Sequence, residues 1–502
     1  MKSLEKVMDT VQERVNQFLS STRKMFINGE WVPSNSGKIY ETINPANGKV
    51  IGKIYEGDKT DVDLAVRAAR AAFKGPWSTY SPAQRSRLLN KLADLIEDHV
   101  DELTYIETID FGSIEPLSRH GWVLGAAEHI RYYAGWATKL NGETIELTTG
   151  GNVHAFTKRE PIGVCGQITS WNFPLLGACW KLAAPLAAGN TVILKPSQQT
   201  SLSTLYLGQL IKEAGFPDGV VNIVTGPGGT IGEAITSHPD IDKIAFTGST
   251  SVGKGIMRKA ADTLKKITLE LGGKSPNIIF ADADIEKAVQ GAFMGIFMNQ
   301  GQVCAAGSRV YVERSIYNEI TDRLVKMAKN MKVGDPFDPT SEMGPLVSKE
   351  QLERVKNYIE IAKKEGGRIL VGGQSPSDSN LADGYYLEPT IIADLNENCT
   401  AVKEEIFGPV LCILPFDDID EVIERGNLTE YGLAAGVYTK DVNKVYKIVN
   451  ELNAGTIWVN GYMNSNSAVP LAGFKQSGVG AEMGYLGIEA YTKTKSVTID
   501  LN

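Results

Sequence analysis

The sequence predicts an α/β protein with two doubly wound parallel-sheet domains and a small β arm. Short apolar segments alternate with helical patterns from residue 163 onward, and a second alternation of the same kind begins at residue 277. Strict alternation of strand and helix is typical of parallel sheets, whose ligands lie beyond the carboxyl ends of the strands. The length of 502 residues also exceeds what a single hydrophobic core usually supports. Two large domains are therefore expected.

The N-terminal region predicts a short amphipathic helix, then hairpins, then further helices. Asn-Gly pairs, which favour the left-handed turn of a hairpin, occur at residues 28–29 and 47–48. A helix is predicted over residues 61–73, where apolar residues recur at helical spacing. Its apolar stripe comprises Val62, Ala65, Ala69 and Ala72. The next helix begins at Ser81-Pro82, an N-cap residue followed by a first-turn proline.

Residues 140–162 alternate in polarity like a β-hairpin that turns at Gly150-Gly151. A two-stranded unit of this size is too small to form a core of its own. We therefore expect an arm that pairs with another subunit.

Two series of apolar segments are expected to form the two parallel sheets. The first comprises VCGQIT, TVILKPS, VVNIVTG, KIAFTGS and KITLEL. The second comprises NIIFADA at 277–283, RVYVE, TIIADL, VLCILPF, GLAAGVYT and TIWVN. The domain boundary is predicted near residue 272, in the turn LGGKSP.

Composition narrows the class of partner. A formal net charge of −8 gives no electrostatic reason to expect nucleic acid or an anionic membrane, so a small molecule is favoured. The sequence has no signal-peptide pattern and no long uncharged apolar run, which predicts a soluble, cytoplasmic protein. The five cysteines are odd in number and unclustered, which argues against disulfides and zinc sites. The five histidines form no metal-binding pair, and no metal is expected.

The segment GSTSVG at 248–253 follows an apolar strand and opens a helix. Glycines at such a junction let backbone amides approach a phosphate at the helix N-terminus. The segment nearly matches the phosphate-binding loop of ATPases, but Gly255 stands where a Ser or Thr must hold magnesium, which argues against an ATPase. The alternative is an ordinary glycine-rich turn.

Glu270 ends an apolar strand in LELGGKSPN. A carboxylate at the carboxyl end of a parallel strand points into the ligand crevice, and partial burial would raise its pKa towards that of a general base. The alternative is a solvated strand-end glutamate.

Cys304 lies in the polar, glycine-containing stretch FMNQGQVCAAGSR. Small neighbours and exposed amides suit a thiolate nucleophile, although a lone cysteine is more often an inert small core residue. A cysteine hydrolase would need a histidine partner, and no histidine follows His238.

Together these segments resemble the aldehyde dehydrogenase superfamily, most of all its class 1 and 2 tetrameric members and their bacterial relatives. LELGGKS resembles the family's glutamate signature and FMNQGQVCA its cysteine signature. Further similar motifs are NPANG, ITSWNFPLL, ILKPS, FTGSTSVG, EEIFGPV and SGVGAEMG. The resemblance covers essentially the whole chain.

The resemblance implies a cofactor-binding domain of residues 1–139 and 163–272 and a catalytic domain of residues 273–474. Residues 140–162 and 485–502 would form an oligomerisation arm of a homotetramer, a dimer of dimers. The cofactor would cross the first sheet without the usual glycine fingerprint. Lys195 would bind the adenosine ribose. The full implied set is Ile168, Trp171, Lys195, Gln198, Gly248, Ser249, Gly253, Glu405 and Phe407.

By the same resemblance, Cys304 attacks the aldehyde, and the oxyanion of the resulting thiohemiacetal expels hydride. The side-chain amide of Asn172 and the backbone N–H of Cys304 would stabilise that oxyanion. Glu270 would then activate water to hydrolyse the thioester. Lys181 and the positive nicotinamide ring would help to form the thiolate.

The substrate pocket is assigned only by resemblance, to Phe173, Gly177, Trp180, Met298, Tyr462, Ser465 and Leu471. These walls imply an apolar or mixed aldehyde, with aliphatic, aromatic or bulky tails admitted. A betaine aldehyde is a secondary expectation, because an aromatic cage suits a trimethylammonium group. The sequence also leaves open a cysteine esterase or acyl-transferase without a nicotinamide, and a non-catalytic protein of the same fold.

Cofactor choice is where the sequence departs from its NAD-preferring relatives. Those relatives usually place Glu three residues after the ribose-binding lysine, where it repels a 2′-phosphate. Here Gln198 follows Lys195 at that spacing. We therefore expect NAD as the cofactor, with NADP also accepted.

Overall fold

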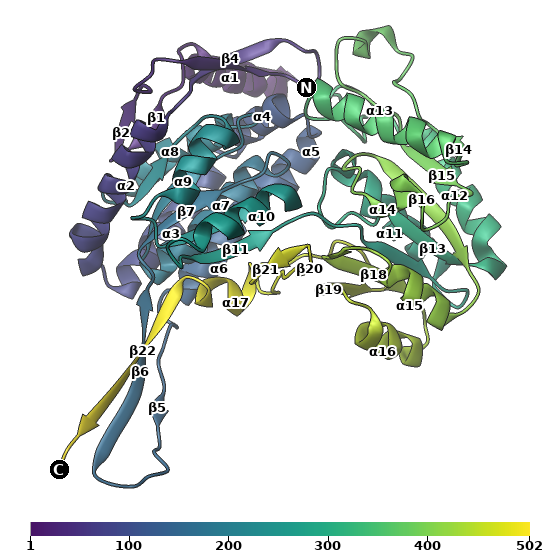
Figure 1. The fold of residues 1–502 in the computed structure, drawn as a ribbon. Helices are drawn as coiled ribbons and strands as arrows, with labels where there is room; N and C mark the ends of the chain where they lie inside the picture. The colour runs from purple at the N-terminus through teal and green to yellow at the C-terminus, as the bar shows by residue number, and fades with distance from the viewer. Residues whose placement is uncertain (1) are drawn as a thin grey trace.

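Two sheet-containing lobes and a projecting arm make up the structure, a computed structural model that describes residues 2–502 (Figure 1). The first sheet has the order β2-β1-β9-β8-β7-β10-β11-β21, and the second has the order β14-β15-β16-β13-β12-β18-β19. Both predicted series of parallel strands are present. The α/β class with parallel sheets is therefore confirmed.

The five predicted strands of the first sheet are parallel and lie at its centre. Antiparallel strands extend both edges, since β1 pairs with β9 through Phe26 and Ile223, and β21 pairs with β11. The strands of this sheet are β1 (Met25–Ile27), β2 (Glu30–Val32), β7 (Val164–Ile168), β8 (Thr191–Lys195), β9 (Val221–Ile223), β10 (Lys243–Thr247), β11 (Lys266–Glu270) and β21 (Gly478–Val479). The edge pairings were not predicted from the sequence.

The first lobe carries helices around its sheet, and some of them pack directly on the strands. They are α1 (Lys2–Leu19), α2 (Lys59–Lys74), α3 (Pro82–Asp98), α4 (Val100–Phe111), α5 (Glu115–Leu117), α6 (Leu124–Trp136), α7 (Pro174–Ala188), α8 (Leu202–Ala214), α9 (Glu233–Ser237) and α10 (Thr250–Ala260), with the shorter turns η1 (Pro76–Thr79), η2 (Ser118–Val123) and η3 (Gly228–Gly232). Helix α2 begins before the predicted residue 61, because Asp58 caps it in a capping box with Asp61. The predicted apolar stripe of α2 is fully buried. Helix α3 begins as predicted after Ser81, whose side chain accepts from Gln84 N.

Two hairpins near the N-terminus form at the predicted Asn-Gly turns. Asn28 and Gly29 both have positive φ, 54° and 75°, as a tight turn between β1 and β2 requires. Gly48, at φ 66°, lies in the longer loop that joins β3 (Ile39–Ile43) to β4 (Val50–Tyr55).

The second sheet is parallel except at one edge, where β14 pairs antiparallel with β15. Its strands are β12 (Pro276–Ile279), β13 (Arg309–Glu313), β14 (Arg368–Val371), β15 (Thr390–Ala393), β16 (Val410–Phe416), β18 (Ala434–Tyr438) and β19 (Thr456–Val459). Its helices are α11 (Ile285–Phe297), α12 (Tyr317–Asn330), α13 (Lys349–Lys364), α14 (Thr400–Lys403), α15 (Ile419–Asn427) and α16 (Val442–Glu451), with the turns η4 (Met298–Gly301), η5 (Arg314–Ile316) and η6 (Ser379–Leu381). Strand β14 is the one strand of this sheet that was not predicted.

The arm is a three-stranded antiparallel sheet of β5 (Thr144–Ile145), β6 (Val153–Pro161) and β22 (Thr492–Asp500). Nine residue pairs join β22 to β6, from Thr492 opposite Pro161 to Asp500 opposite Val153. Figure 1 shows the arm extending away from both lobes, with the C-terminus at its far end. The predicted hairpin is present, but its first strand is only two residues long.

The C-terminal segment returns from the second lobe to the first. It contains β20 (Phe474–Lys475), which pairs with β17 (Tyr431–Gly432), then β21 and α17 (Gly484–Glu489). Over residues 2–502, no helix combines the length and hydropathy needed to cross a bilayer.

Candidate active site

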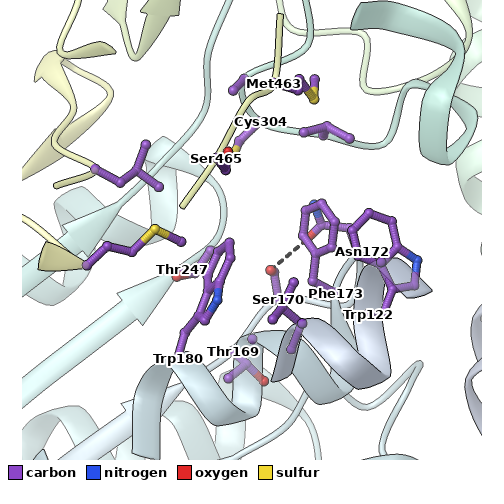
Figure 2. Close-up of a pocket in the computed structure, with 18 of the residues that line it drawn as sticks. Trp122, Thr169, Ser170, Asn172, Phe173, Trp180, Thr247, Cys304, Met463 and Ser465 are labelled. Carbon is purple, nitrogen blue, oxygen red and sulfur yellow. Dashed lines mark hydrogen bonds between the residues drawn. The ribbon is translucent and has the colours of Figure 1, made fainter. Parts of the chain in front are cut away.

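A cavity of about 590 Å³ lies between the lobes, at the carboxyl ends of three neighbouring strands. Residues at the carboxyl ends of β7, β10 and β11 line one part of it, including Thr169, Thr247 and Leu271. Residues of the second lobe, including Cys304, line another part. Figure 2 shows Cys304 beside Ser465, across the cavity from Phe173 and Trp180. This is the position at which a doubly wound sheet binds its ligand.

The backbone turns sharply just before Cys304. Asn299, Gln300 and Gly301 have φ of 55°, 57° and 67°, three successive residues in the left-handed region. This conformation is costly for residues other than glycine and persists only where the surroundings enforce it. The run follows the end of α11 at Phe297, and the segment after it lines the cavity.

Cys304 is partly exposed, unlike the other four cysteines, which are buried, and all five carry free thiols. Burial of the sulfur raises the pKa of the Cys304 thiol to about 12, and the nearby Glu405 and Glu270 add to the increase. The backbone N–H groups of Ala305 and Cys304 oppose it. The protein alone therefore favours the protonated thiol, and a positive charge nearby would be needed to stabilise the thiolate.

The amide of Asn172 is held in a fixed orientation at the cavity. Its Nδ2 donates to the carbonyl oxygen of Gln302 at 2.8 Å, and its Oδ1 accepts from Ser170 Oγ at 2.7 Å. Figure 2 shows the second of these bonds. Asn299 Nδ2 donates in turn to the Asn172 carbonyl at 3.1 Å. Asn172 Nδ2 thus lies against the segment that carries Cys304.

Glu270 is buried at the end of β11, and its Oε1 has no hydrogen-bond partner among the described residues. Burial raises the pKa of this carboxyl well above 4.5, the like charge of Glu482 raises it further, and Lys181 opposes both. Glu270 is not itself one of the residues that line the cavity, although its neighbour Leu271 is. A raised pKa suits a group that must accept a proton near neutral pH.

Lys181 reaches the cavity from α7, but its ammonium forms a buried ion pair with Glu482. Its charge therefore acts on Glu482, which it contacts, and on Glu270, whose pKa it lowers. The structure thus gives no support to the expectation that Lys181 stabilises the thiolate, because Glu482 holds the ammonium.

The expected cofactor residues fall into two groups. Five line the cavity, namely Trp171, Gly248, Ser249, Glu405 and Phe407. Four do not, namely Ile168, Lys195, Gln198 and Gly253. Lys195 is buried, donates to the Pro196 carbonyl at 2.9 Å, and has its pKa lowered to about 8 by burial. Gly253 lies against Leu271, where a Cβ would come within 2.5 Å of Leu271 Cδ2.

Glu405 and Phe407 occupy strained or buried positions at the cavity. Glu405 Oε1 accepts from Gly273 N at 2.9 Å, and burial raises the pKa of this carboxyl to about 7. A Cβ at Gly272 would lie 2.6 Å from Glu405 Oε2, so a side chain there would displace the Glu405 carboxylate. Phe407 has a φ of 63° and its ring meets that of Trp171 edge-on at 5.1 Å.

The expected substrate residues line the cavity with one exception. Phe173, Gly177, Trp180, Met298, Ser465 and Leu471 are all in its walls. Tyr462 is not, and the expectation for this residue is corrected: its ring is buried behind the Cys304 segment, because glycines at 295, 307 and 436 leave room for it there.

Several cavity residues were not predicted from the sequence. Trp122 comes from η2, which precedes the predicted site motifs in the sequence. The centroids of its ring and of the Phe173 ring are 4.8 Å apart. Trp458 lies in β19 and Met463 follows in the next loop. Glu482 could have been noticed, since it is the one charged residue of the motif SGVGAEMG. The described residues 2–502 contain no group of three or more His, Cys, Asp or Glu side chains placed to hold a metal ion.

A partly exposed thiol lies at the crevice of a doubly wound sheet, near a buried strand-end carboxylate, an arrangement that suits a nucleotide-binding enzyme with a nucleophilic cysteine. The sequence profile of the aldehyde dehydrogenase family matches residues 31–497. The chain belongs to the aldehyde dehydrogenase family, and it is therefore an NAD(P)-dependent enzyme that oxidises aldehydes to carboxylic acids. This membership sets aside the esterase and non-catalytic alternatives.

Similar proteins come from bacteria and from animals. A putative aldehyde dehydrogenase of Bacillus subtilis, DhaS, is 50% identical over 492 residues, which cover 98% of each chain. Retinal dehydrogenase 2 of Gallus gallus is 49% identical over 481 residues, 95% of this chain and 92% of its own. The NAD+ complex of aldehyde dehydrogenase from Bacillus cereus superposes with a TM-score of 0.95 at 50% identity, covering 97% of this chain and 99% of that one.

Proposed function

We propose that this enzyme oxidises aldehydes through a covalent adduct on Cys304, with Asn172 as an oxyanion donor and Glu270 as the general base. The proposal depends most on one observation, that Cys304 and Asn172 line the same cavity, at the end of the sheet where β11 carries Glu270. The Oε1 of this buried carboxylate has no hydrogen-bond partner among the described residues. Rapid-mixing kinetics of Cys304→Ala and Glu270→Gln test these assignments. Cys304→Ala should lose all turnover, and Glu270→Gln should release reduced cofactor only in an initial burst.

The chemistry follows from the properties of the residues. The Cys304 thiol first gives up its proton to solvent, and the thiolate sulfur then attacks the carbonyl carbon. The electron pair of the broken π bond moves to the carbonyl oxygen, near Asn172 Nδ2 and the Cys304 N–H. As the C=O bond re-forms, the C–H bond breaks and hydride leaves, so that a thioester remains on Cys304. When bound, the oxidised nicotinamide ring supplies the acceptor for that hydride. Glu270 then takes a proton from water as the water oxygen attacks the thioester, and the C–S bond breaks to release the acid.

The residues at the cavity suit a dinucleotide. Helix α10 has no side-chain cap at its N-terminus, and Gly248 and Ser249 just before it line the cavity. Uncapped first-turn N–H groups and the helix dipole favour a pyrophosphate there. Glu405 and Phe407 line the same cavity, where they would hold the nicotinamide end. The NAD+ bound to the Bacillus cereus relative supports NAD as the cofactor.

We propose that the preferred substrates have long or bulky apolar tails. The cavity walls carry the rings of Trp122, Phe173, Trp180 and Trp458, and Gly177 adds no side chain that would narrow them. The same tryptophans, with Glu128 in the wall, make a trimethylammonium aldehyde the second candidate. Comparing kcat/KM for long-chain, aromatic and betaine aldehydes decides between the two, and a preference for short aldehydes contradicts both.

We propose that the arm joins subunits into a homotetramer. It projects from the lobes, and apolar side chains on it are exposed, namely Ile145, Leu147, Ile499 and Leu501. Exposed apolar side chains on an open sheet favour burial against another chain.

Replacing Gln198 by glutamate is expected to shift cofactor preference towards NAD about tenfold or more. Gln198 is partly exposed in the turn that follows Lys195. A carboxylate about 4 Å from a 2′-phosphate would cost roughly 1 kcal/mol in water and roughly 4 kcal/mol at an effective dielectric near 20. The ratio of kcat/KM for NAD and NADP measures the shift in the wild type and in Gln198→Glu.

The neighbouring Gln199→Glu is the matched control for this prediction. Its side chain turns towards Ser348, with Nε2 at 3.5 Å from Ser348 Oγ, yet the variant changes the charge by the same amount. A similar shift in both variants would mean that long-range charge, and not the position of Gln198, selects the cofactor. An unchanged ratio in Gln198→Glu would remove the proposed role.

The pH dependence of thioester hydrolysis is expected to report Glu270. This carboxyl has a raised pKa, so it is protonated and inactive as a base at low pH, and hydrolysis should rise as pH passes a midpoint above 4.5. In Glu482→Gln the like charge disappears and Lys181 loses its partner. Both changes favour the ionised form of Glu270, so the midpoint should move to lower pH. A midpoint that stays in place would contradict the assignment.

A further inference from the structure

The ring of Tyr462 is enclosed by three glycines from separate parts of the second lobe. A Cβ would lie 2.9 Å from the ring at Gly295 of α11, 3.0 Å at Gly307 after Cys304, and 2.5 Å at Gly436 of β18. A Cβ at residue 295 or 436 would force the ring or the backbone to move, and a Cβ at residue 307 would make a very tight contact with the ring. The ring therefore packs directly on the backbone of all three segments.

The hydroxyl of Tyr462 is bonded to the residue that follows the nucleophile. It donates to the Ala305 carbonyl at 2.9 Å, and Gly307 N donates to the Gly295 carbonyl at the same distance. On the other side, a Cβ at Gly273 would lie 2.3 Å from the Cys304 carbonyl oxygen. The segment of Cys304 is thus held between the 272–273 turn and Tyr462.

The loop that carries Tyr462 is itself fixed. Asn460 has a φ of 53° and Met463 a φ of 57°, so left-handed residues flank it on both sides. Asn460 Oδ1 accepts from Thr439 N at 3.0 Å, and its Nδ2 donates to the Thr439 carbonyl at 3.0 Å. These bonds attach the loop to the end of β18, so the position of the Tyr462 hydroxyl is set by the sheet.

We propose that Tyr462 is a positioning residue, which orients Ala305 so that the Ala305 N–H faces the Cys304 sulfur. The N–H groups of Ala305 and Cys304 are the backbone donors that favour the thiolate. Tyr462 does not line the cavity, so it acts on the reaction only through this segment. The proposal rests on the assignment of Cys304 as the nucleophile.

Tyr462→Phe tests the proposal because it keeps the ring and its packing and removes only the hydroxyl. We expect kcat to fall about fivefold to tenfold, the effect of one lost hydrogen bond, with little change in the KM for aldehyde. We also expect alkylation of Cys304 by iodoacetamide in the free enzyme to shift to higher pH by about half a unit or more, because the thiolate loses alignment with its donor. A purely structural role would lower the unfolding midpoint without moving the alkylation profile.

Tyr438→Phe is the matched control. Tyr438 is also buried and lies against Gly291 of the same helix α11, and its hydroxyl has no hydrogen-bond partner among the described residues. This variant should keep both kcat and the alkylation profile. Equal effects in the two variants, or an unchanged alkylation profile in Tyr462→Phe, would overturn the proposal.

A further measurement separates this proposal from the proposed function. Alkylation of wild-type Cys304 should abolish oxidation, and retained activity after complete alkylation would contradict the nucleophile itself and not merely Tyr462. Should Tyr462→Phe fail to fold, Asn460→Asp loosens the same loop by removing the Nδ2 donor to Thr439. It should give the same shift in alkylation, and an unshifted profile would again overturn the proposal.

Discussion

Cys304→Ala is expected to abolish both aldehyde oxidation and labelling by a thiol reagent at the cavity. Direct loss of hydride from an aldehyde would leave an acylium product of very high energy, and without the sulfur no thiohemiacetal can form. The other four cysteines are buried and should not substitute for it. Cys399→Ala is the control, since Cys399 lies at the start of α14 outside the cavity and should keep full activity.

Glu270→Gln is expected to separate the two halves of the same reaction. The variant should still form the thioester and release reduced cofactor in a burst, then stall, because the amide cannot accept a proton from water. Steady turnover should fall about a hundredfold or more. Rapid-mixing measurements of reduced cofactor give the size of the burst and the later rate. Unchanged steady turnover would show that another group activates the water.

Asn172→Ala is the third variant for which we expect a large effect. Loss of one preorganised donor to an oxyanion typically lowers kcat by about 10² to 10³, and cofactor affinity should barely change. The measurement is kcat together with the dissociation constant of NAD. Near-normal kcat would mean that the Cys304 N–H suffices alone.

Ser170→Ala is the matched control for Asn172. It removes the hydroxyl that donates to Asn172 Oδ1 but leaves the Nδ2 donor in place. We expect a smaller fall in kcat than for Asn172→Ala, since the bond from Nδ2 to the Gln302 carbonyl still orients the amide. An equal fall would indicate that orientation, and not the donor itself, accounts for the loss.

Local signals in the sequence predicted most of the fold. Continuous apolar runs such as TVILK marked the buried parallel strands, and Asn28-Gly29 marked a turn that needs two positive φ values. The pairing of β1 with β9, and of β21 with β11, could not be predicted in the same way. These short strands have no periodicity of their own, and their partners lie far away in the chain.

The site was predicted through motifs, and two of its side chains have surroundings that the motifs did not predict. A motif identifies which side chains are present but not which way they point. Lys181 turns to Glu482, a residue 301 positions later, and Tyr462 turns into a space left by glycines. Cavity walls such as Trp122 come from segments that carry no chemical signature, so only the packed structure brings them to the site.

The return of the C-terminal segment to the first sheet has a consequence for how the protein folds as it is synthesised. Until residues 478–479 emerge, the outer edge of β11 has no strand beside it, and the buried bond between Gln167 and Tyr491 spans 324 positions. Contacts between residues this far apart in the sequence form late, because a long loop must close before they can stabilise the fold. The edge that presents Glu270 is therefore among the last parts of the enzyme to become ordered, so an incomplete nascent chain would be inactive there and prone to aggregate.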